Sequence, residues 1–206
     1  MVGIVDYGVG NLFSLQSSFS FIGAEVTVTA DADVLAGCDR ILLPGVGAFE
    51  DAARKLRESG LASAVLDAAQ SGKPLLGVCL GMQMLFERSF EYGEHEGLGL
   101  LRGSVKPIRP VIGPDLKVPH IGWNALHFPK DKPVSPLFRY IREGDFVYFV
   151  HSFAAMDCAD SVIAETEYGA SLTAAAACGN VFGCQFHPEK SGTVGLNILR
   201  AFCETS

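Results

Sequence analysis

Residues 75 to 83 read Leu75-Leu76-Gly77-Val78-Cys79-Leu80-Gly81-Met82-Gln83. The apolar run 75–78 predicts a buried strand, and the residues from Leu80 onward predict a helix. A cysteine therefore lies where a strand turns sharply into a helix, with a glycine two residues to either side. Such glycines let the turn close and leave the central side chain exposed, as in a nucleophile elbow. An average cysteine is a small buried hydrophobe, but this glycine spacing favours a nucleophile.

The predicted helix start behind Cys79 favours the reactive form of its side chain. Free amides and partial positive charge at a helix N-terminus stabilise an anion, and the thiolate is the nucleophilic form of cysteine. The amide of Leu80, the next residue, would point at the oxyanion that forms when a carbonyl is attacked. Cys79 is thus a candidate nucleophile and Leu80 a candidate oxyanion donor.

A base and an orienting group are found at the end of another predicted strand. The predicted strand 181–186 leads into His187-Pro188-Glu189. Positions i and i+2 of an extended segment share a face, and proline keeps the residue before it out of the helical region. The Glu189 carboxylate can therefore lie beside the His187 ring and fix its tautomer. A His-x-Glu pair is a weak signal alone, but with the elbow cysteine it predicts a triad.

A glycine-rich turn, Pro44-Gly45-Val46-Gly47, follows the predicted strand 40–43. Ligands of open α/β sheets collect at the carboxyl ends of the strands, where this turn would lie. Its amides, that of Val46 in particular, are candidates for a second oxyanion donor. A tight strand-to-helix connection without any chemistry explains this segment equally well.

Around these motifs the first half of the chain alternates short apolar runs with amphipathic segments. We predict strands at 3–6, 25–29, 40–43 and 75–78, and helices at 12–22, 48–58, 61–71 and 80–88. Asn11 can cap the first helix, and Gly23 ends it. This alternation predicts a parallel α/β sheet with helices on both faces.

The second half of the chain has a different pattern. Strand and loop signals fill residues 97–181, which we interpret as mixed and antiparallel additions to the same sheet, and a helix at 192–203 closes the chain. No repeat, low-complexity tract or linker divides the sequence. We therefore predict one domain over residues 1–206.

Composition and charge limit the classes of protein to consider. Of the 206 residues, 49% are hydrophobic and 19% are charged, which is typical of a folded globular protein. A formal net charge of -7 without a basic stripe argues against binding to nucleic acid or to an anionic membrane surface. No apolar run approaches the roughly 20 residues of a spanning helix, and an acid at position 6 excludes a secretory signal. We predict a cytoplasmic protein.

Neither a metal nor a dinucleotide is indicated. The six cysteines form no Cys-x-x-Cys and no cluster with histidine at ligand spacing, so we predict no metal site and expect most of them to be buried hydrophobes. Gly8-Val9-Gly10 lacks the third glycine of a dinucleotide fingerprint, because residue 13 is phenylalanine.

The two chemical motifs, 77–83 and 186–189, resemble those of the class I, triad-type glutamine amidotransferases and occur in the order usual there. Four further segments are similar to the glutaminase subunits of imidazole glycerol phosphate synthase: Asp6–Asn11, Pro44–Phe49, His120–Asn124 and Tyr148–Ser152. The resemblance runs from residue 3 to the closing helix. It implies a flavodoxin-like, mostly parallel sheet with helices on both faces and antiparallel strands added in the second half.

For the site, the resemblance implies that Cys79 attacks the side-chain amide of glutamine and forms a thioester. His187 would carry the proton to the leaving ammonia, and water would then release glutamate. The substrate would be held by Gly47, Gln83, Ser152 and Phe153. Relatives often carry tyrosine at position 153, a difference that affects substrate packing rather than the triad. No cofactor is implied.

The resemblance also implies a partner, a cyclase subunit built as a barrel of eight β/α units, in a heterodimer. The cyclase would use the ammonia to make imidazole glycerol phosphate and an aminoimidazole carboxamide nucleotide in histidine biosynthesis. Ammonia reacts only when unprotonated, so shielded transfer avoids its loss as ammonium. Asn11 and Trp123 would lie at the interface, where aromatic residues are enriched, although a lone tryptophan is more often found in a core. The turn 45–47 would respond to the cyclase and its ligand.

Alternative interpretations remain open on the residues alone. His120 and His151 can line the site or serve as hydrogen-bonded structural histidines. Amidotransferase subunits for pyridoxal phosphate or purine synthesis share the triad, but the motif 120–124 argues against them. A hydrolase of γ-glutamyl peptides would share the cysteine and histidine without an ammonia acceptor. A catalytically silent binding module would have no need of a complete triad.

Overall fold

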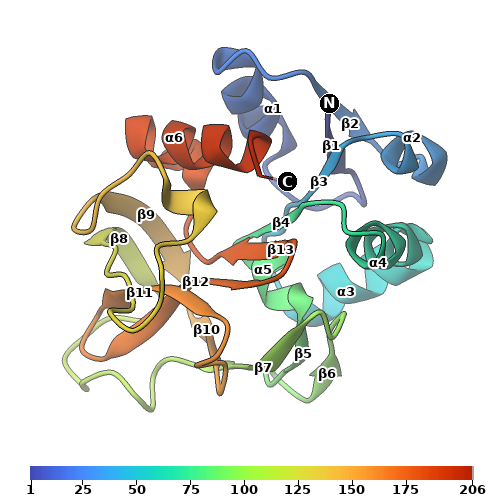
Figure 1. Cartoon of the computed structure of the whole chain (residues 1–206). Helices are drawn as coiled ribbons and strands as arrows, with labels where there is room; N and C mark the ends of the chain where they lie inside the picture. The colour runs from blue at the N-terminus through green and yellow to red at the C-terminus, as the bar shows by residue number, and fades with distance from the viewer. Residues whose placement is uncertain (206) are drawn as a thin grey trace.

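The computed structural model describes residues 1–205, and a seven-stranded sheet lies at its centre (Figure 1). Its order is β11-β12-β13-β4-β3-β1-β2. The strands are β1 Val2–Val5, β2 Val26–Thr29, β3 Arg40–Leu43, β4 Leu75–Val78, β11 Val162–Glu167, β12 Ser171–Cys178 and β13 Val181–Cys184. Neighbours from β2 to β13 are parallel, and β12 and β11 extend one edge antiparallel. The predicted parallel α/β sheet is confirmed.

Helices cover both faces of this sheet, because alternate strand residues point to opposite sides. The helices are α1 Leu12–Phe21, α2 Ala32–Ala36, α3 Phe49–Glu58, α4 Leu61–Gln70, α5 Leu80–Leu85 and α6 Gly192–Cys203, with 3-10 turns η1 Pro136–Phe138 and η2 Pro188–Lys190. Ile41 and Leu43 of β3 pack in the core that buries α2, α3 and α4. Leu42, between them, packs in the core under α1 and α6.

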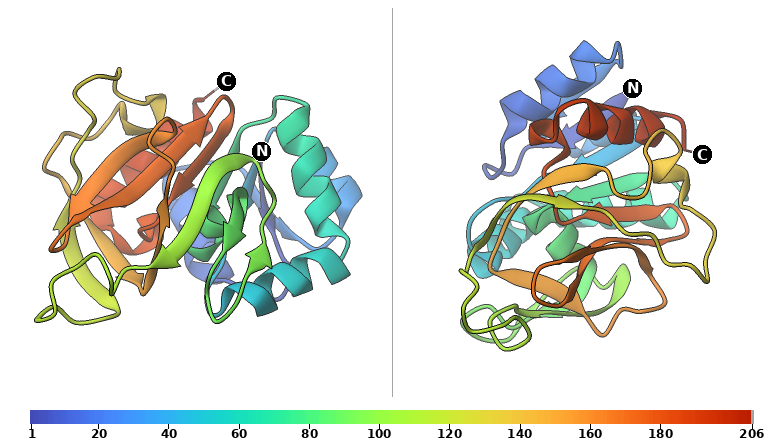
Figure 2. Two further views of the ribbon diagram at one scale, coloured as in Figure 1. Left: turned by 90° about the horizontal axis from the view of Figure 1, so that it is seen from below. Right: turned by 90° about the vertical axis from the view of Figure 1, so that its left-hand side faces the viewer.

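The remaining strands form two small sheets of their own. A four-stranded sheet has the order β10-β7-β5-β6, with β5 Phe86–Ser89, β6 His95–Glu96, β7 Leu101–Pro107 and β10 Phe153–Met156, within residues 1–205. It lies on the side of the molecule away from α1 and α6 (Figures 1 and 2). An antiparallel pair joins β8 His120–Ala125 to β9 Phe146–His151. Our expectation that the strands of residues 97–181 extend one sheet is therefore wrong for β7, β8, β9 and β10 and right for β11 and β12.

The helix expected at 80–88 is also wrong beyond Leu85. Phe86 is already extended, and β5 pairs with β7 and β6. The reason is tertiary: the chain at 97–100 crosses the end of α5, and amides of Leu98 and Leu100 donate to the carbonyls of Met84 and Leu85. These long-range bonds satisfy the terminal carbonyls that another helical turn would otherwise use.

The helix caps differ from expectation as well. Asn11 precedes α1, but its side chain makes no capping hydrogen bond, because its backbone (φ -89°, ψ 63°) is not in the extended conformation usual for a cap. The short helix α2, which the sequence did not suggest, is capped by Asp31 through its carboxylate and the amide of Asp33 at 2.8 Å. Gly23 follows α1 with φ +78°, as its predicted role as terminator requires.

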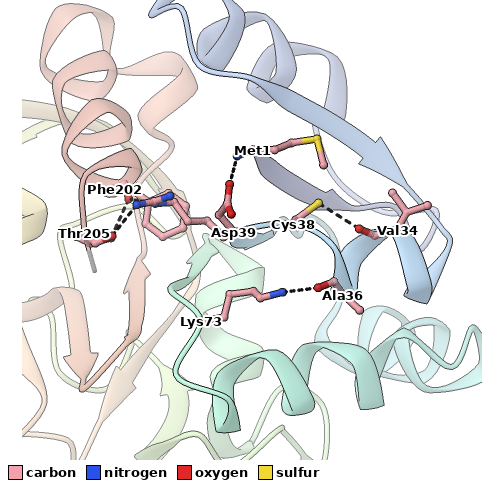
Figure 3. Close-up of polar contacts among 9 residues, drawn as sticks. Met1, Val34, Ala36, Cys38, Asp39, Lys73, Phe202 and Thr205 are labelled. Atoms are coloured by element: carbon pink, nitrogen blue, oxygen red, sulfur yellow. Dashed lines mark hydrogen bonds and ion pairs between the residues drawn. The ribbon is translucent and has the colours of Figure 1, made fainter.

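The amino ends of the parallel strands are tied together by polar contacts (Figure 3). The Arg40 guanidinium at the start of β3 donates to the carbonyls of Phe202, at 3.1 Å, and Thr205, at 2.8 Å. The N-terminal amine pairs with Asp39, and the Lys73 ammonium donates to the carbonyl of Ala36 at 2.8 Å. Side chains thus close this end of the sheet by satisfying backbone carbonyls.

Across residues 1–205, the helices are too short or too polar to pass through a membrane.

Candidate active site

Cys79 lies in the turn between β4 and α5 with a strained backbone. Its φ of 55° and ψ of -112° lie where side chains with a Cβ are rarely found. The flanking glycines are required by space: a Cβ on Gly81 would lie 2.0 Å from the Leu43 oxygen, and one on Gly77 would lie 2.7 Å from the Met82 nitrogen. The turn therefore closes only with these residues, and the predicted elbow is present.

His187 and Glu189 meet at the end of the neighbouring strand. The His187 Nδ1 lies 2.8 Å from Glu189 Oε1, and both side chains are buried. Burial opposes charge on the imidazole, but hydrogen bonds to Cys79 and Glu189 outweigh it and raise the pKa of His187 to about 9. A His187 imidazolium is thus favoured at neutral pH.

The segment that carries these two residues is held rigidly. Ser191 donates from Oγ to the His187 carbonyl at 2.6 Å and accepts from the Tyr148 amide at 3.0 Å. The His187 amide in turn donates to the Tyr148 carbonyl at 2.9 Å. Strand β9 therefore fixes the position of the histidine, which no local pattern around 187–189 could have indicated.

A cavity of about 300 Å³ opens above Cys79, within the usual range for small-molecule sites. Its lining contains Cys79, His187 and six more residues that we predicted from the sequence: Val46, Gly47, Leu80, Gln83, Ser152 and Phe153. The structure thus brings together residues from four distant stretches of the chain. Glu189 lies behind His187 rather than in the cavity lining.

The turn 44–47 packs against the first residues of α5. A Cβ on Gly45 would lie 2.6 Å from the Gly81 nitrogen, so only glycine permits this approach. The buried Tyr7 hydroxyl donates to the Pro44 carbonyl at 2.7 Å and anchors the turn. Both candidate oxyanion donors, Val46 and Leu80, therefore border the same cavity as Cys79.

The floor of the cavity carries amide groups. Gln83 donates from Nε2 to the Phe153 carbonyl at 3.0 Å and to Gln185 Oε1 at 2.9 Å. These bonds join α5, the start of β10 and the end of β13 beneath the substrate space. Two of the predicted substrate-holding residues, Gln83 and Phe153, are thus part of one connected network.

His120 and His151 form a buried pair beside this network. Their rings are joined from Nδ1 of His120 to Nε2 of His151 at 3.0 Å, and Nδ1 of His151 lies 2.9 Å from the Phe153 carbonyl. Burial lowers the pKa of His151 to about 4, so the ring is neutral. Only His151 lines the cavity, and the His120 ring is stacked between Phe149 and Tyr168.

The two residues predicted at a subunit interface lie outside the cavity. Trp123, on β8, is 52% exposed, and Ile121, two residues before it on the same face, is 58% exposed. Asn11 is half-buried at the start of α1. Their place at a subunit interface stays a prediction.

Sequence reasoning missed two residues at the site. Glu91 follows β5 and borders the cavity, and its carboxylate accepts a hydrogen bond from the Phe49 amide at 2.6 Å. Gln185, which is fully buried, lies two residues before His187. Gln185 adjoins a motif and could have been found there. Glu91 comes from a polar loop without any local signal.

Comparisons with known proteins agree with this geometry. A sequence model of the family described as glutamine amidotransferase class-I matches residues 3–205. The chain is 48% identical over 206 residues to the imidazole glycerol phosphate synthase subunit HisH of Wolinella succinogenes, covering 99% of each chain. It is 45% identical over 205 residues to the protein of that name from Caldanaerobacter subterraneus subsp. tengcongensis, covering 99% of this chain and 98% of the other.

Solved structures share the fold. A crystal structure described as a glutamine amidotransferase superposes with a TM-score of 0.75 at 20% identity, covering 98% of this chain and 97% of the other. The structure of PurLQS from Thermotoga maritima has a TM-score of 0.73 at 21% identity, with the same coverage.

Proposed function

The chain belongs to the class I glutamine amidotransferases and, within them, to the HisH subunits of imidazole glycerol phosphate synthase, and from this premise we propose its mechanism. The chain hydrolyses L-glutamine to L-glutamate and ammonia with Cys79 as nucleophile, His187 as acid and base, and Glu189 as orienting group. The observation that carries the proposal is the meeting of an elbow cysteine and a His187–Glu189 pair at one cavity.

The first half of the reaction forms a thioester. The Cys79 thiolate attacks the side-chain amide carbon of glutamine, and the amides of Leu80 and Val46 stabilise the resulting oxyanion. The raised pKa of His187, about 9, keeps its proton available for the leaving nitrogen. Collapse of the tetrahedral intermediate expels ammonia and leaves the acyl group on sulfur.

The second half returns the enzyme to its starting state. His187, now neutral, takes a proton from water, which attacks the thioester carbon. Glutamate leaves, and the proton gained by His187 restores the thiolate–imidazolium pair. Glu189 accepts from Nδ1 throughout, which presents Nε2 to the reacting atoms.

Glutamine is held by groups that border the cavity. Gly47, Gln83, Ser152 and Phe153 supply backbone and amide contacts. The Glu91 carboxylate is the anionic group of the lining suited to the α-ammonium of glutamine. Residues 1–206 act together as one glutaminase domain.

The ammonia passes to a cyclase subunit with a β/α barrel, in a heterodimer, for the synthesis of imidazole glycerol phosphate. Asn11 and the exposed Trp123 contact this partner, because a half-exposed tryptophan beside an exposed isoleucine suits the core of an interface. The complex works in the cytoplasm. Direct transfer is needed because free ammonia would be protonated in neutral water.

The experiment measures glutamate release from glutamine by the wild-type chain and by Cys79→Ala, each alone and with a cyclase subunit and its nucleotide ligand. The wild type should release glutamate, most strongly in the full mixture, and Cys79→Ala should lose at least about 10³-fold in rate. Partner binding by Cys79→Ala should persist and serves as the control for folding.

Three other outcomes would each contradict a different part of the proposed function. Glutamate release by Cys79→Ala would remove this residue from the nucleophile's role. Wild-type hydrolysis that is indifferent to the cyclase would keep the triad but send the ammonia to a different acceptor. No hydrolysis under any condition would favour a silent binding module.

A further inference from the structure

Gln185 is a buried polar residue that the mechanism above leaves without a role. It lies between the end of β13 and His187, and its side chain is fully shielded from solvent. Its Nε2 lies 3.7 Å from Cys79 Sγ, a distance at which the large sulfur atom still accepts a hydrogen bond. The amide therefore touches the atom that attacks glutamine.

The orientation of this amide is set by a chain of partners. The Phe153 carbonyl can only accept, so the Gln83 group facing it at 3.0 Å is the Nε2 donor. The Nε2 of Gln83 also donates to Gln185 at 2.9 Å, so the Gln185 atom that faces Gln83 is the acceptor Oε1. Its Nε2 is then left to point at Cys79. A flipped Gln185 would set two donors against each other.

The carbonyl that anchors this chain is itself held in place. His151 Nδ1 donates to the Phe153 carbonyl at 2.9 Å, and His151 Nε2 lies 3.0 Å from His120 Nδ1. His120 is fully buried between two aromatic rings. The donor on Gln185 is thus fixed by contacts that reach to β8, with no freedom to swing away.

We propose that Gln185 is a further catalytic residue of the glutaminase reaction: its side-chain amide donates a hydrogen bond to the Cys79 thiolate and favours that form over the thiol. This inference rests on the proposed role of Cys79. A hydrogen bond to a charged acceptor is stronger than one to a neutral acceptor, so the amide stabilises the thiolate selectively. It also holds Sγ in one position facing the cavity.

The test is alkylation of the full chain by iodoacetamide, followed cysteine by cysteine through peptide mass spectrometry. Gln185→Met keeps the side-chain volume but removes the donor. At about pH 6, alkylation of Cys79 should be about tenfold slower in this variant than in the wild type. The deficit should shrink as the pH rises, because a higher pH favours the thiolate in both proteins.

The exposed Cys178 is an internal control, because the same reagent labels it in the same sample. Cys79 acts on the ionisable groups Tyr7, Cys184 and His187, and Gln185→Met leaves all three in place. Equal Cys79 rates in variant and wild type would overturn the proposal. A change shared by Cys178 would assign Gln185 a structural role and overturn it too.

A second variant, Gln83→Met, tests the role of Gln185 if Gln185→Met does not fold. Gln83→Met removes the bond that orients Gln185 but leaves its donor, so Cys79 alkylation should fall by a smaller factor, about two- to threefold. An unchanged rate would contradict the orienting chain. Because alkylation needs no turnover of glutamine, its result is independent of the glutamate-release assay that tests the proposed function.

Discussion

The two ends of the parallel strands are built in opposite ways. At the amino end, side chains such as Arg40 and Lys73 donate to backbone carbonyls and leave them satisfied (Figure 3). At the carboxyl end, Cys79 has a strained backbone, and Glu189 Oε2 is buried without a hydrogen-bond partner within residues 1–205. One end is arranged for stability, and the other stores strain.

This contrast between the two ends of the sheet shows which contacts stabilise the fold. Strained backbone and under-satisfied polar groups persist only where the surrounding structure imposes them. Here the cost at the carboxyl end is offset by contacts at the amino end and in the two helix layers. Substitutions at the carboxyl end should therefore change activity more than stability, and those at the amino end the reverse.

The largest effect is expected from Glu189→Gln. The amide is isosteric but neutral, so it no longer stabilises the His187 imidazolium, and turnover should fall on the order of 10²–10⁴-fold. The assay is glutamate release at saturating glutamine, and the unfolding midpoint in urea serves as the control for folding. Wild-type turnover in this variant would mean that the carboxylate is structural.

The second effect concerns pH and stability. The pKa of His187 is about 9 in the folded chain and 6.5 in the unfolded chain. The positive charge of His187 therefore contributes stability that is complete below about pH 6.5 and is lost as the pH rises through 9. Between these values the wild type should lose about 3 kcal/mol more unfolding free energy than His187→Gln.

Urea titrations of both proteins at several pH values measure this difference. The raised pKa values of other buried groups, among them Cys184, act equally in the two proteins and cancel. Parallel pH profiles for wild type and variant would contradict a raised pKa at His187.

The third effect belongs to the amino end. Arg40→Met keeps the aliphatic stem but removes the donors to Phe202 and Thr205, so the free energy of unfolding should fall by about 2 kcal/mol. Glutamate release per folded molecule should stay unchanged. Arg102→Met, at an exposed arginine, is the matched control and should leave both quantities near the wild type. A folded Arg40→Met variant without activity would contradict the inference that the amino end of the sheet serves stability and the carboxyl end serves activity.

The smallest effect is a gain. Cys79→Gly should relieve the positive φ of 55° and raise the free energy of unfolding by about 1 kcal/mol relative to Cys79→Ala, which keeps the strain. Both variants should be inactive, so the pair separates backbone strain from chemistry. Equal stability in urea titrations would show that the turn is not strained.

Much of the fold was predictable because its signals are local. Strand β4 and helix α6 were predicted with the observed bounds, and the elbow glycines predicted the turn that Cys79 occupies. Sequence reasoning failed at 86–88, where we expected the helix from Leu80 to continue but the chain leaves it after Leu85. The competing bonds come from residues 98–100, which no local window contains.

The residues of the candidate site also divide into those that local motifs predicted and those that they could not. The motifs named Cys79, His187 and Glu189 because a nucleophile elbow and a His-x-Glu pair need particular residue types at fixed short spacing. The sequence could not name Glu91 or the bond from Gln185 to Cys79, since their partners lie 42 and 106 positions away along the chain.

The sequence by itself therefore determined the layers, the elbow and the candidate reacting groups, because each depends on residues within a few positions. The tertiary structure alone decided how β5 to β10 leave the central sheet, which amide faces the sulfur and which end of the sheet carries strain. These depend on packing and on long-range hydrogen bonds, whose free energy is gained only when distant segments meet.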